Sequence, residues 1–584
     1  MAGNIPDQKE LERELSEYLS KKYGNRIKIV SPILFPTPSS EESDETEPSS
    51  PSGVERIHFD MKPEELEAYL DQFVIRQEQA KAVLATKICT HFNRIKRSRV
   101  RAGREGAAHI VGQIKNNIIM IGPTGVGKTY IIKLIAAKLG VPFVKGDATK
   151  FSETGYVGGD VEDLVRDLVH HADDDIELAQ YGIIYIDEVD KIASSRGSMG
   201  PDVSRTGVQR ALLKPMEETE VDLKVAHDPI SQLQAIERYR KTGKRERRTI
   251  NTRNILFIVN GAFGGLDEIV KERVARQGMG FGASLRSKAG EGDYLKQVKS
   301  EDLINFGFES EFVGRLPVVV IFEELGAEDL YAILRNPNNP IINGKKRDFR
   351  AYGIDIRFED EALRMLAHQA YEEHTGARGL VSAAERVLLP FEKKLPSTDI
   401  AEFLASPEVV EDAAGSLAKL LAGVDDEARR RFEAALEEEK QVFRQLIEKR
   451  RKDLAKRYEY LMTPGRIDLV LELFFKGDTD LEGAFDELLY MYNQVRAYEV
   501  VFLDRLGLSL EFEEEAMDEI MARSIATGRN ASQVCKFLSQ DLEFGLKLVR
   551  DKTGRQSFAI TLEAIKDPEA YINRLIKDSY SYFR

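Results

Sequence analysis

The eight residues GPTGVGKT, from Gly122 to Thr129, match the pattern G-x-x-x-x-G-K-[ST] of phosphate-binding loops. An apolar run ends just before them at Ile121, and a helical pattern begins near Lys128. Glycines in such a loop let backbone N–H groups close around phosphate oxygens, and the helix N-terminus adds partial positive charge. The spacing therefore predicts a nucleotide site formed by Gly122, Thr124, Gly125, Val126, Gly127, Lys128, Thr129 and Tyr130.

A second segment, IIYIDE, carries the acidic groups that such a site needs. In the loop, Lys128 would neutralise the β- and γ-phosphates of ATP, and Thr129 would bind Mg²⁺. The apolar residues of IIYIDE predict a buried strand ending in Asp187 and Glu188, at the sheet edge where ligands bind. Asp187 suits a Mg²⁺ contact, direct or through water, and Glu188 suits the base that polarises the attacking water.

A further polar residue, Asn260, ends the apolar run ILFIV. Its amide would lie beside the γ-phosphate and orient the attacking water. An asparagine that only terminates a strand is the alternative interpretation.

Apolar runs alternate with helical stretches up to about residue 322, and this pattern predicts the scaffold of the site. The runs are residues 117–121, 142–145, 182–186, 255–259 and 318–322. The helical stretches between them include residues 130–139, 161–171 and 208–218. Buried strands separated by helices indicate an α/β fold with a parallel sheet covered on both faces. Past residue 323 helices dominate.

Composition limits the function classes. No run approaches the roughly 18 apolar residues of a membrane span, and the polar N-terminus lacks a signal-peptide core, so we expect a cytoplasmic protein without a membrane partner. The net charge of −14 argues against general nucleic-acid binding. The two cysteines, Cys89 and Cys535, predict neither a disulfide framework nor a structural zinc site.

Seven stretches resemble the ClpX family of AAA+ ATPases and, more distantly, HslU. They are QFVIRQEQAKAVL, IGPTGVGKT, ETGYVGGDVEDL, IIYIDEVDKIA, GVQRALLKPME, ESEFVGRLPVV and TGARGL, in residues 60 to 400. The resemblance implies a ring-shaped homo-hexamer that binds ATP and Mg²⁺ between neighbouring subunits. It also implies an unfoldase that threads protein substrates through a pore.

The resemblance assigns roles to residues outside the phosphate loop. Arg315 matches the arginine finger that reaches the next subunit's nucleotide, and Arg378 matches the sensor arginine of the small domain. Val74 and Ile75 match the segment that packs on adenine. The family's usual glycine after that pair is replaced here by Arg76.

Segments that handle protein partners are also similar. Tyr156 and Val157, in GYVG, match the pore loop that grips substrate, and residues 202–205 resemble a second pore loop. Met279, Gly280 and Phe281 match the tip that docks on a ClpP-like peptidase, with a flexible apolar Met in first place. A basic loop at the pore entrance, or else a solvated charged insert, is predicted for Lys241, Lys244, Arg245, Arg247 and Arg248.

We predict six parts for the chain. Residues 1–35 form a short N-terminal element, proposed as a tethered recognition element in place of the family's zinc domain, and residues 36–59 form a Ser/Pro/Glu-rich flexible linker. The large AAA+ domain covers residues 60–322 and the small helical domain residues 323–400. Residues 401–500 are a charged helical region, expected as a helical hairpin or short coiled coil with an apolar face at Phe432, Leu436, Val442, Leu446 and Leu454.

The last part, residues 501–584, resembles a diverged copy of the small domain. GIDIRFEDEAL begins at Gly353 and GLSLEFEEEAM at Gly507, a separation of 154 residues (507 − 353). Arg529 would lie close to the place of the sensor arginine. Coincidence of a common strand–helix pattern is the alternative. The second copy has no phosphate loop, so we expect it to contact a neighbour or a substrate rather than nucleotide.

The leading functional prediction is an ATP-driven protein unfoldase and translocase that feeds a ClpP-like peptidase. One alternative is an ATPase that remodels protein complexes without a peptidase. The other is a nucleic-acid-directed AAA+ ATPase that uses the basic insert, which the acidic balance and the GYVG loop disfavour.

Overall fold

The protein is described here by a computed structural model. It describes residues 57, 59–102, 115–151, 159–194, 203–223, 248–277, 294–423, 426–477 and 479–581. Among these residues, no helix combines the length and the apolar character needed to cross a membrane.

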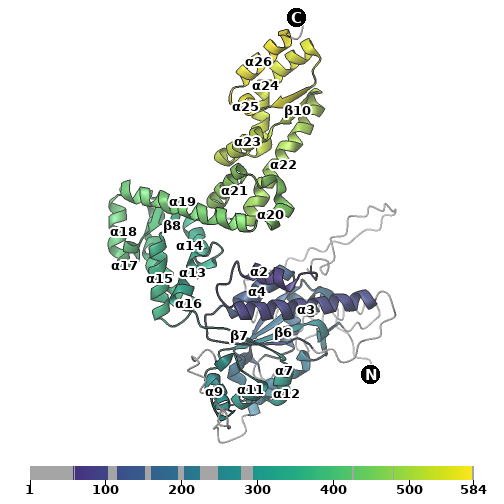
Figure 1. The fold of residues 1–584 in the computed structure, drawn as a ribbon, viewed down its shortest axis with the longest axis vertical. Coiled ribbons are helices and arrows are strands. Elements are labelled where there is room, and N and C mark those ends of the chain that lie inside the picture. Colours follow the sequence, from purple (N-terminus) through teal and green to yellow (C-terminus); the bar gives the residue numbers. More distant parts are fainter. Residues whose placement is uncertain are drawn as a thin grey trace, which may run out of the picture. The chain divides into compact units, whose positions relative to one another are not determined.

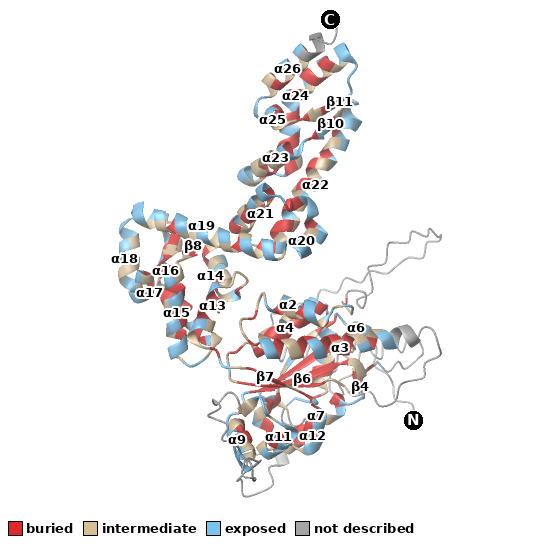
Figure 2. Cartoon of the chain, in the orientation of Figure 1, coloured by how far each residue is buried: buried red, intermediate tan, exposed pale blue. Residues whose placement is uncertain are grey.

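Five parallel strands form the central sheet in the order β2-β3-β6-β1-β7. They are β1 (Ile118–Ile121), β2 (Phe143–Asp147), β3 (Ile183–Asp187), β6 (Leu256–Gly261) and β7 (Val318–Ile321). The five apolar runs predicted as strands are confirmed. Most strand residues are buried, as Figure 2 shows, which explains why the strands are continuous apolar runs rather than alternating ones.

Helices cover both faces of this sheet (Figure 1). Ile118 and Met120 of β1 belong to one core with α3 and α4, whereas Ile119 and Ile121 belong to another with α5 and α7, as alternation along a strand requires. The helices of this part are α2 (Pro63–Leu70), α3 (Glu78–Ala102), α4 (Lys128–Leu139), α5 (Asp163–His171), α6 (Ile176–Ala179), α7 (Val203–Met216), α9 (Leu266–Gln277), α11 (Ser300–Phe306) and α12 (Ser310–Gly314). A small antiparallel pair joins β4 (Glu220–Asp222) to β5 (Thr249–Asn251).

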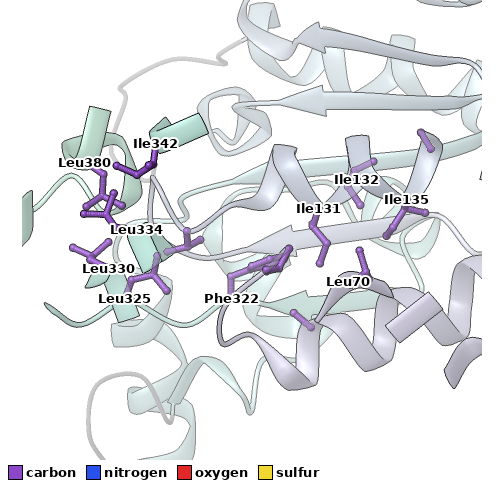
Figure 3. Packing of buried hydrophobic residues seen from close by; sticks show 14 of the residues in the cluster. Leu70, Ile131, Ile132, Ile135, Phe322, Leu325, Leu330, Leu334, Ile342 and Leu380 are labelled. Atoms are coloured by element: carbon purple, nitrogen blue, oxygen red, sulfur yellow. The ribbon is translucent and has the colours of Figure 1, made fainter. Parts of the chain in front are cut away.

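The next unit is mostly helical. Its elements are α13 (Ala327–Arg335), α14 (Pro340–Arg350), β8 (Asp355–Phe358), α15 (Asp360–Glu372), α16 (Ala377–Lys394), β9 (Glu402–Ala405), α17 (Pro407–Glu411) and α18 (Ala413–Ala422). Its core is continuous with that of α4, through Phe322 and Leu325 (Figure 3). Because β9 pairs with β8 and Val410 lies in the same core, we propose that the small domain continues past residue 400 to at least residue 411.

The charged region forms four helices: α19 (Asp426–Lys449), α20 (Arg451–Tyr458), α21 (Pro464–Lys476) and α22 (Leu481–Leu506). They do not form the expected hairpin or coiled coil. Phe443 and Ile447 are buried in a core that continues to the C-terminal part, while Val442 is only half-buried. Phe432 and Leu454 of the expected apolar face are buried, and Leu436 and Leu446 pack against this core, so only Val442 departs from the expected face. Helices from distant parts of the chain cover the face.

The C-terminal part repeats the order of the small domain: β10 (Ser509–Phe512), α23 (Glu514–Thr527), α24 (Ala531–Thr553), β11 (Ser557–Ile560), α25 (Leu562–Lys566) and α26 (Pro568–Ser581). The first residue of each element follows its counterpart by 154 positions up to α24 and by 155 from β11. Both strand pairs are parallel. We therefore propose a diverged copy. The offset aligns Arg529 with Thr375, and Ser532 with Arg378, so the sensor arginine has no counterpart.

Candidate nucleotide site

The predicted phosphate loop connects β1 to α4 at the C-terminal edge of the sheet. Gly127 has φ of 90° and caps α4 in the left-handed region, where a side chain is strained. Gly125 has φ of 77°, and a Cβ there would lie 2.1 Å from the carbonyl oxygen of Thr375. Glycine is thus required at Gly127 by backbone conformation and at Gly125 by close approach as well.

Lys128 lies inside this loop with only 8% of its surface exposed. Its ammonium group donates to the carbonyl oxygens of Gly122 and, at 2.6 Å, Pro123. Burial lowers the pKa of Lys128 to about 8, the carboxylates of Asp187 and Asp190 oppose that shift, and the charge of Arg378 adds to it. The loop therefore holds a desolvated cation where phosphate oxygens would replace the carbonyl groups.

Asp187 ends β3 and is the centre of a polar cluster. The Lys145 ammonium lies 2.7 Å from one carboxylate oxygen. The other oxygen accepts from the side chain of Asn260 and, at 3.0 Å, from the backbone N–H of Glu188. Beside this cluster, the hydroxyls of Thr129 and Tyr185 are 3.0 Å apart. Thr129, Asp187 and Asn260, three residues predicted from separate motifs, are thus placed at one edge of the sheet.

Two features of this edge fit a nucleotide with Mg²⁺. The hydroxyl of Thr129 and the carboxylate of Asp187 are the oxygen donors that Mg²⁺ prefers. The Oδ1 atom of Asn260 is buried without a hydrogen-bond partner among the described residues. A buried acceptor of this kind needs a donor, and an ordered water beside the phosphates would supply one.

Glu188 follows Asp187 with an exposed side chain and a φ of 57°. A non-glycine residue in the left-handed region is strained, and such strain concentrates at functional sites. The turn starts a short 3₁₀ helix, η3 (Val189–Ile192), whose Asp190 accepts from the backbone N–H of Phe263 at 3.3 Å. The carboxylate of Glu188 is therefore free to act in solvent at the edge of the site.

The small domain reaches the phosphate loop through the start of α16. The backbone N–H of Ala377 donates to the carbonyl oxygen of Gly125 at 2.8 Å. Arg378 is the next residue, and its charge is felt at Lys128. The predicted sensor arginine thus belongs to the helix end that contacts the loop.

Arg315 lies elsewhere. It follows α12, and its guanidinium pairs with Glu217 at the end of α7. The side chain of Asn117 donates to the carbonyl oxygen of Arg315 at 3.1 Å and to that of Met216 at 3.3 Å. Asn117 immediately precedes β1, so Arg315 is held at the N-terminal edge of the sheet, opposite the edge that carries the phosphate loop.

The segment matched to adenine binding precedes α3. Val74 is buried and its carbonyl oxygen accepts from Lys81 at 3.2 Å, while Ile75 is half-buried. Arg76, which replaces the family's glycine, has φ of 59° and forms ion pairs with Glu323 and Asp329.

Several predicted segments lie outside the described residues: Tyr156, Val157, Asp202, Lys241, Lys244, Arg245, Arg247 and the docking tip Met279, Gly280 and Phe281. Of the basic loop, only Arg248 is described, and it is exposed.

Sequence reasoning missed Lys145 and Tyr185. The signal that could have identified them is a charged or hydroxyl-bearing residue inside an apolar strand pattern. In the structure, β2 and β3 pair in a register that places Lys145 beside Tyr185 and Asp147 beside Asp187.

Two family models match the chain in sequence order. One is described as AAA domain (Cdc48 subfamily) and covers residues 113–319. The other is described as the C-terminal, D2-small domain, of ClpB protein and covers residues 325–395. The second match ends before β9, the strand that pairs with β8.

Proteins named ATP-dependent Clp protease ATP-binding subunit ClpX are similar to this chain. The one from Treponema denticola is 40% identical over 339 residues, which make up 57% of this chain and 77% of the relative. Those from Borrelia duttonii and Borrelia recurrentis are 41% identical over 338 residues, or 58% of this chain and 75% of each relative. With this identity over three quarters of the relatives and a matching nucleotide edge, the chain is an AAA+ ATPase and belongs to the ClpX family.

Proposed function

We propose that the chain is an ATP-driven protein unfoldase and translocase that works as a homo-hexamer and delivers substrates to a ClpP-like peptidase. The relatives' name, a Clp protease ATP-binding subunit, supports the peptidase partner. Tyr156 and Val157 are proposed to grip the threaded chain, and Met279, Gly280 and Phe281 to dock on the peptidase. These roles rest on the sequence resemblance.

The place of Arg315 is the observation that carries the oligomeric part of the proposal. β7 pairs with β1 in parallel, Ile118 opposite Val318 and Ile121 opposite Ile321. The phosphate loop follows Ile121, whereas Arg315 precedes Val318. Because a strand advances about 3.3 Å per residue, β7 alone (Val318–Ile321) separates the two edges by roughly 10 Å. This position supports the proposal that Arg315 serves the nucleotide of another subunit rather than its own.

Within one subunit the described residues divide the work of hydrolysis. Lys128 and the backbone of the loop bind the phosphates, and Thr129 with Asp187 would hold Mg²⁺, which stabilises developing charge when bound. Glu188 takes a proton from the attacking water, and Asn260 orients that water. Arg378 presents a cation from the small domain when the loop is occupied.

The direct test is ATP-dependent loss of fluorescence from a folded, tagged fluorescent protein, with and without a ClpP-type peptidase. We expect fluorescence to fall only with ATP and fragments to form only with peptidase. The Glu188→Gln variant should bind ATP but show neither the loss of fluorescence nor the fragments. The Tyr156→Ala variant should keep its ATPase activity but unfold the substrate more slowly. ATP hydrolysis without fragments for any peptidase would favour a peptidase-independent remodelling ATPase instead.

The oligomeric part has its own test, which uses mixed subunits. Arg315→Ala and Glu188→Gln chains should each be inactive alone, because each lacks one half of every shared site. Mixtures should regain a fraction of ATPase activity, since a Glu188→Gln subunit supplies Arg315 to the site of an Arg315→Ala neighbour, which keeps Glu188. Absence of any recovery in verified mixed assemblies would contradict an arginine that acts between subunits.

A further inference from the structure

Arg76 and Gln77 form a turn whose backbone angles are unfavourable for both residues. Their φ angles are 59° and 68°, both in the left-handed region where glycine is favoured. The resemblance to the ClpX family implies glycine at the first of these positions. Strain of this kind persists only where contacts with the surrounding structure hold the residue in place.

The Arg76 guanidinium connects two carboxylates near the start of the small domain. Its Nη1 atom lies 2.6 Å from Oδ2 of Asp329, and its Nε atom donates to Glu323 at 3.2 Å. Asp329 is in the first turn of α13, and its carboxylate also accepts from the backbone N–H of Gly326 at 2.8 Å. Glu323 lies in the interdomain linker, residues 322–326, which connects β7 to α13.

Gln77 binds the same linker through its amide. Its Nε2 atom donates to the carbonyl oxygen of Glu323 at 2.7 Å, and its Oε1 atom accepts from the backbone N–H of Glu323 at 2.9 Å. Only 2% of Gln77 is exposed. The turn is therefore fixed to the linker by both a buried amide and a guanidinium.

The other end of the same segment is bound to the far end of α13. The carbonyl oxygen of Gln72 accepts from the side chain of Asn336 at 3.0 Å and from that of Asn338 at 3.1 Å. The adenine segment, residues 72–77, is thus bonded at both ends to residues that flank one helix of the small domain. Val74 and Ile75 lie between these two attachments.

We propose that Arg76 is a positioning residue that couples occupancy of the adenine segment to the position of the small domain. Adenine packed on Val74 and Ile75 fixes the position of the segment. The ion pair between Arg76 and Asp329 then fixes the position of α13 relative to the segment. The small domain then keeps the start of α16 on the phosphate loop, where Ala377 bonds Gly125. This inference rests on nucleotide binding at the proposed site.

Arg76→Gly tests the coupling without endangering the fold, because glycine relaxes the strained turn and Gln77 still binds the linker. We expect little change in Tm. The dissociation constant for fluorescent ADP and the KM for ATP should both rise about threefold to fivefold, whereas kcat should change less. The change is modest because the Arg76 side chain keeps 39% of its surface exposed, which screens its ion pairs.

A distance measurement separates coupling from simple loss of affinity. Cys89 and Cys535 are buried, so spin labels can be placed at Ala137→Cys on α4 and Glu361→Cys on α15, both exposed positions. Saturating ADP should narrow the distribution of label distances in the parent chain. In Arg76→Gly, at an ADP concentration that saturates its weaker site, the distribution should remain broad.

Three variants act as controls. Asp329→Asn should reproduce Arg76→Gly, and the double variant should be no worse than either, because both remove one interaction. Arg76→Lys should restore part of the affinity. Lys296→Met removes another ion pair of Glu323, at 2.6 Å, without touching Asp329, and should bind ADP as the parent does.

The inference is overturned if Arg76→Gly binds ADP with parental affinity and narrows the distances normally. It is also overturned if Lys296→Met has the same effect as Arg76→Gly, because the linker's general electrostatics would then be the cause. If the parent chain itself binds no nucleotide, the proposed function fails, and that result is distinct from both.

Discussion

At the scale of single residues, the nucleotide edge is a set of polar groups whose partners are incomplete without a ligand. Lys128 is desolvated on carbonyl oxygens, and Asn260 keeps a buried acceptor without a donor among the described residues. Each arrangement costs free energy in the empty protein, because a buried polar group loses its hydration. Bound phosphates and an ordered water would remove that cost, which favours a site organised before the nucleotide arrives.

Asn260→Ala distinguishes a water-orienting amide from one that only ends a strand. If the amide orients the attacking water, kcat should fall about tenfold to a hundredfold, on the order of the loss of one preorganised hydrogen bond, with KM little changed. Steady-state ATPase kinetics measure both. Asn251→Ala, which removes a cap at a distant 3₁₀ turn, is the matched control and should keep kcat. A normal kcat for Asn260→Ala would leave only the strand-ending role.

At the scale of elements, α19 is attached to the small domain by buried charges. Glu439 pairs with Lys346 and, at 2.9 Å, with Arg357 of β8, which is only 1% exposed. The Arg357 guanidinium also lies 4.9 Å from the ring centre of Phe475 on α21. A second attachment joins Arg431 to Glu359 at 2.7 Å. Because a buried arginine needs its counter-charges, β8 depends on α19 as well as on its own domain.

Glu439→Gln should therefore destabilise the small domain, although the side chain keeps its size. Loss of the carboxylate charge removes the ion pair of Lys346 and leaves Arg357 with Asp355 alone, and we expect the free energy of unfolding to fall by about 3 kcal/mol. Glu438→Gln changes the neighbouring residue, whose nearest charge, on Arg335, is 3.9 Å away, and should cost about 0.5 kcal/mol or less. Calorimetric Tm values of the two variants measure this difference. Equal shifts in Tm would show that the buried ion pairs of Glu439 add no more stability than the exposed one of Glu438.

The elements also show what local patterns can and cannot predict. All five sheet strands were predictable, because strands buried on both faces read as apolar runs, and the phosphate loop was predictable from its spacing. The pair Glu439–Arg357 spans 82 residues and follows from tertiary packing alone. The Lys145–Asp187 pair depends on the register of β2 against β3, and the proposed end of the small domain depends on the pairing of β8 with β9.

At the scale of the whole molecule, the described residues form hydrophobic cores of two kinds. Two cores pack on the sheet, and one of them continues into the small domain, whereas the third contains only residues from Phe443 onwards. The third core includes the proposed copy of the small domain, which has no phosphate loop and has Ser532 where Arg378 would be expected. Nucleotide should therefore stabilise one part of the chain and not the other.

Calorimetry can test this difference directly. A slowly hydrolysed ATP analogue at about 100 times its dissociation constant should stabilise the nucleotide-binding part by about 2.7 kcal/mol and raise its Tm by several degrees. The transition of the C-terminal core should not move. Tyr571→Ala, which removes a buried ring from that core, identifies its transition. Equal shifts of both transitions would contradict a copy that does not bind nucleotide.

The position of Arg315 has a consequence for inheritance. Under the proposed function, an arginine at the edge opposite its own phosphate loop acts on the nucleotide of a neighbouring subunit. A cell that carries one normal and one Arg315→Ala copy of the gene would, if the proposed ring forms, build mixed rings in which each Arg315→Ala chain inactivates the nucleotide site of a normal neighbour. The harm would exceed the share of faulty chains, so we expect the substitution to behave as a dominant allele rather than a recessive one.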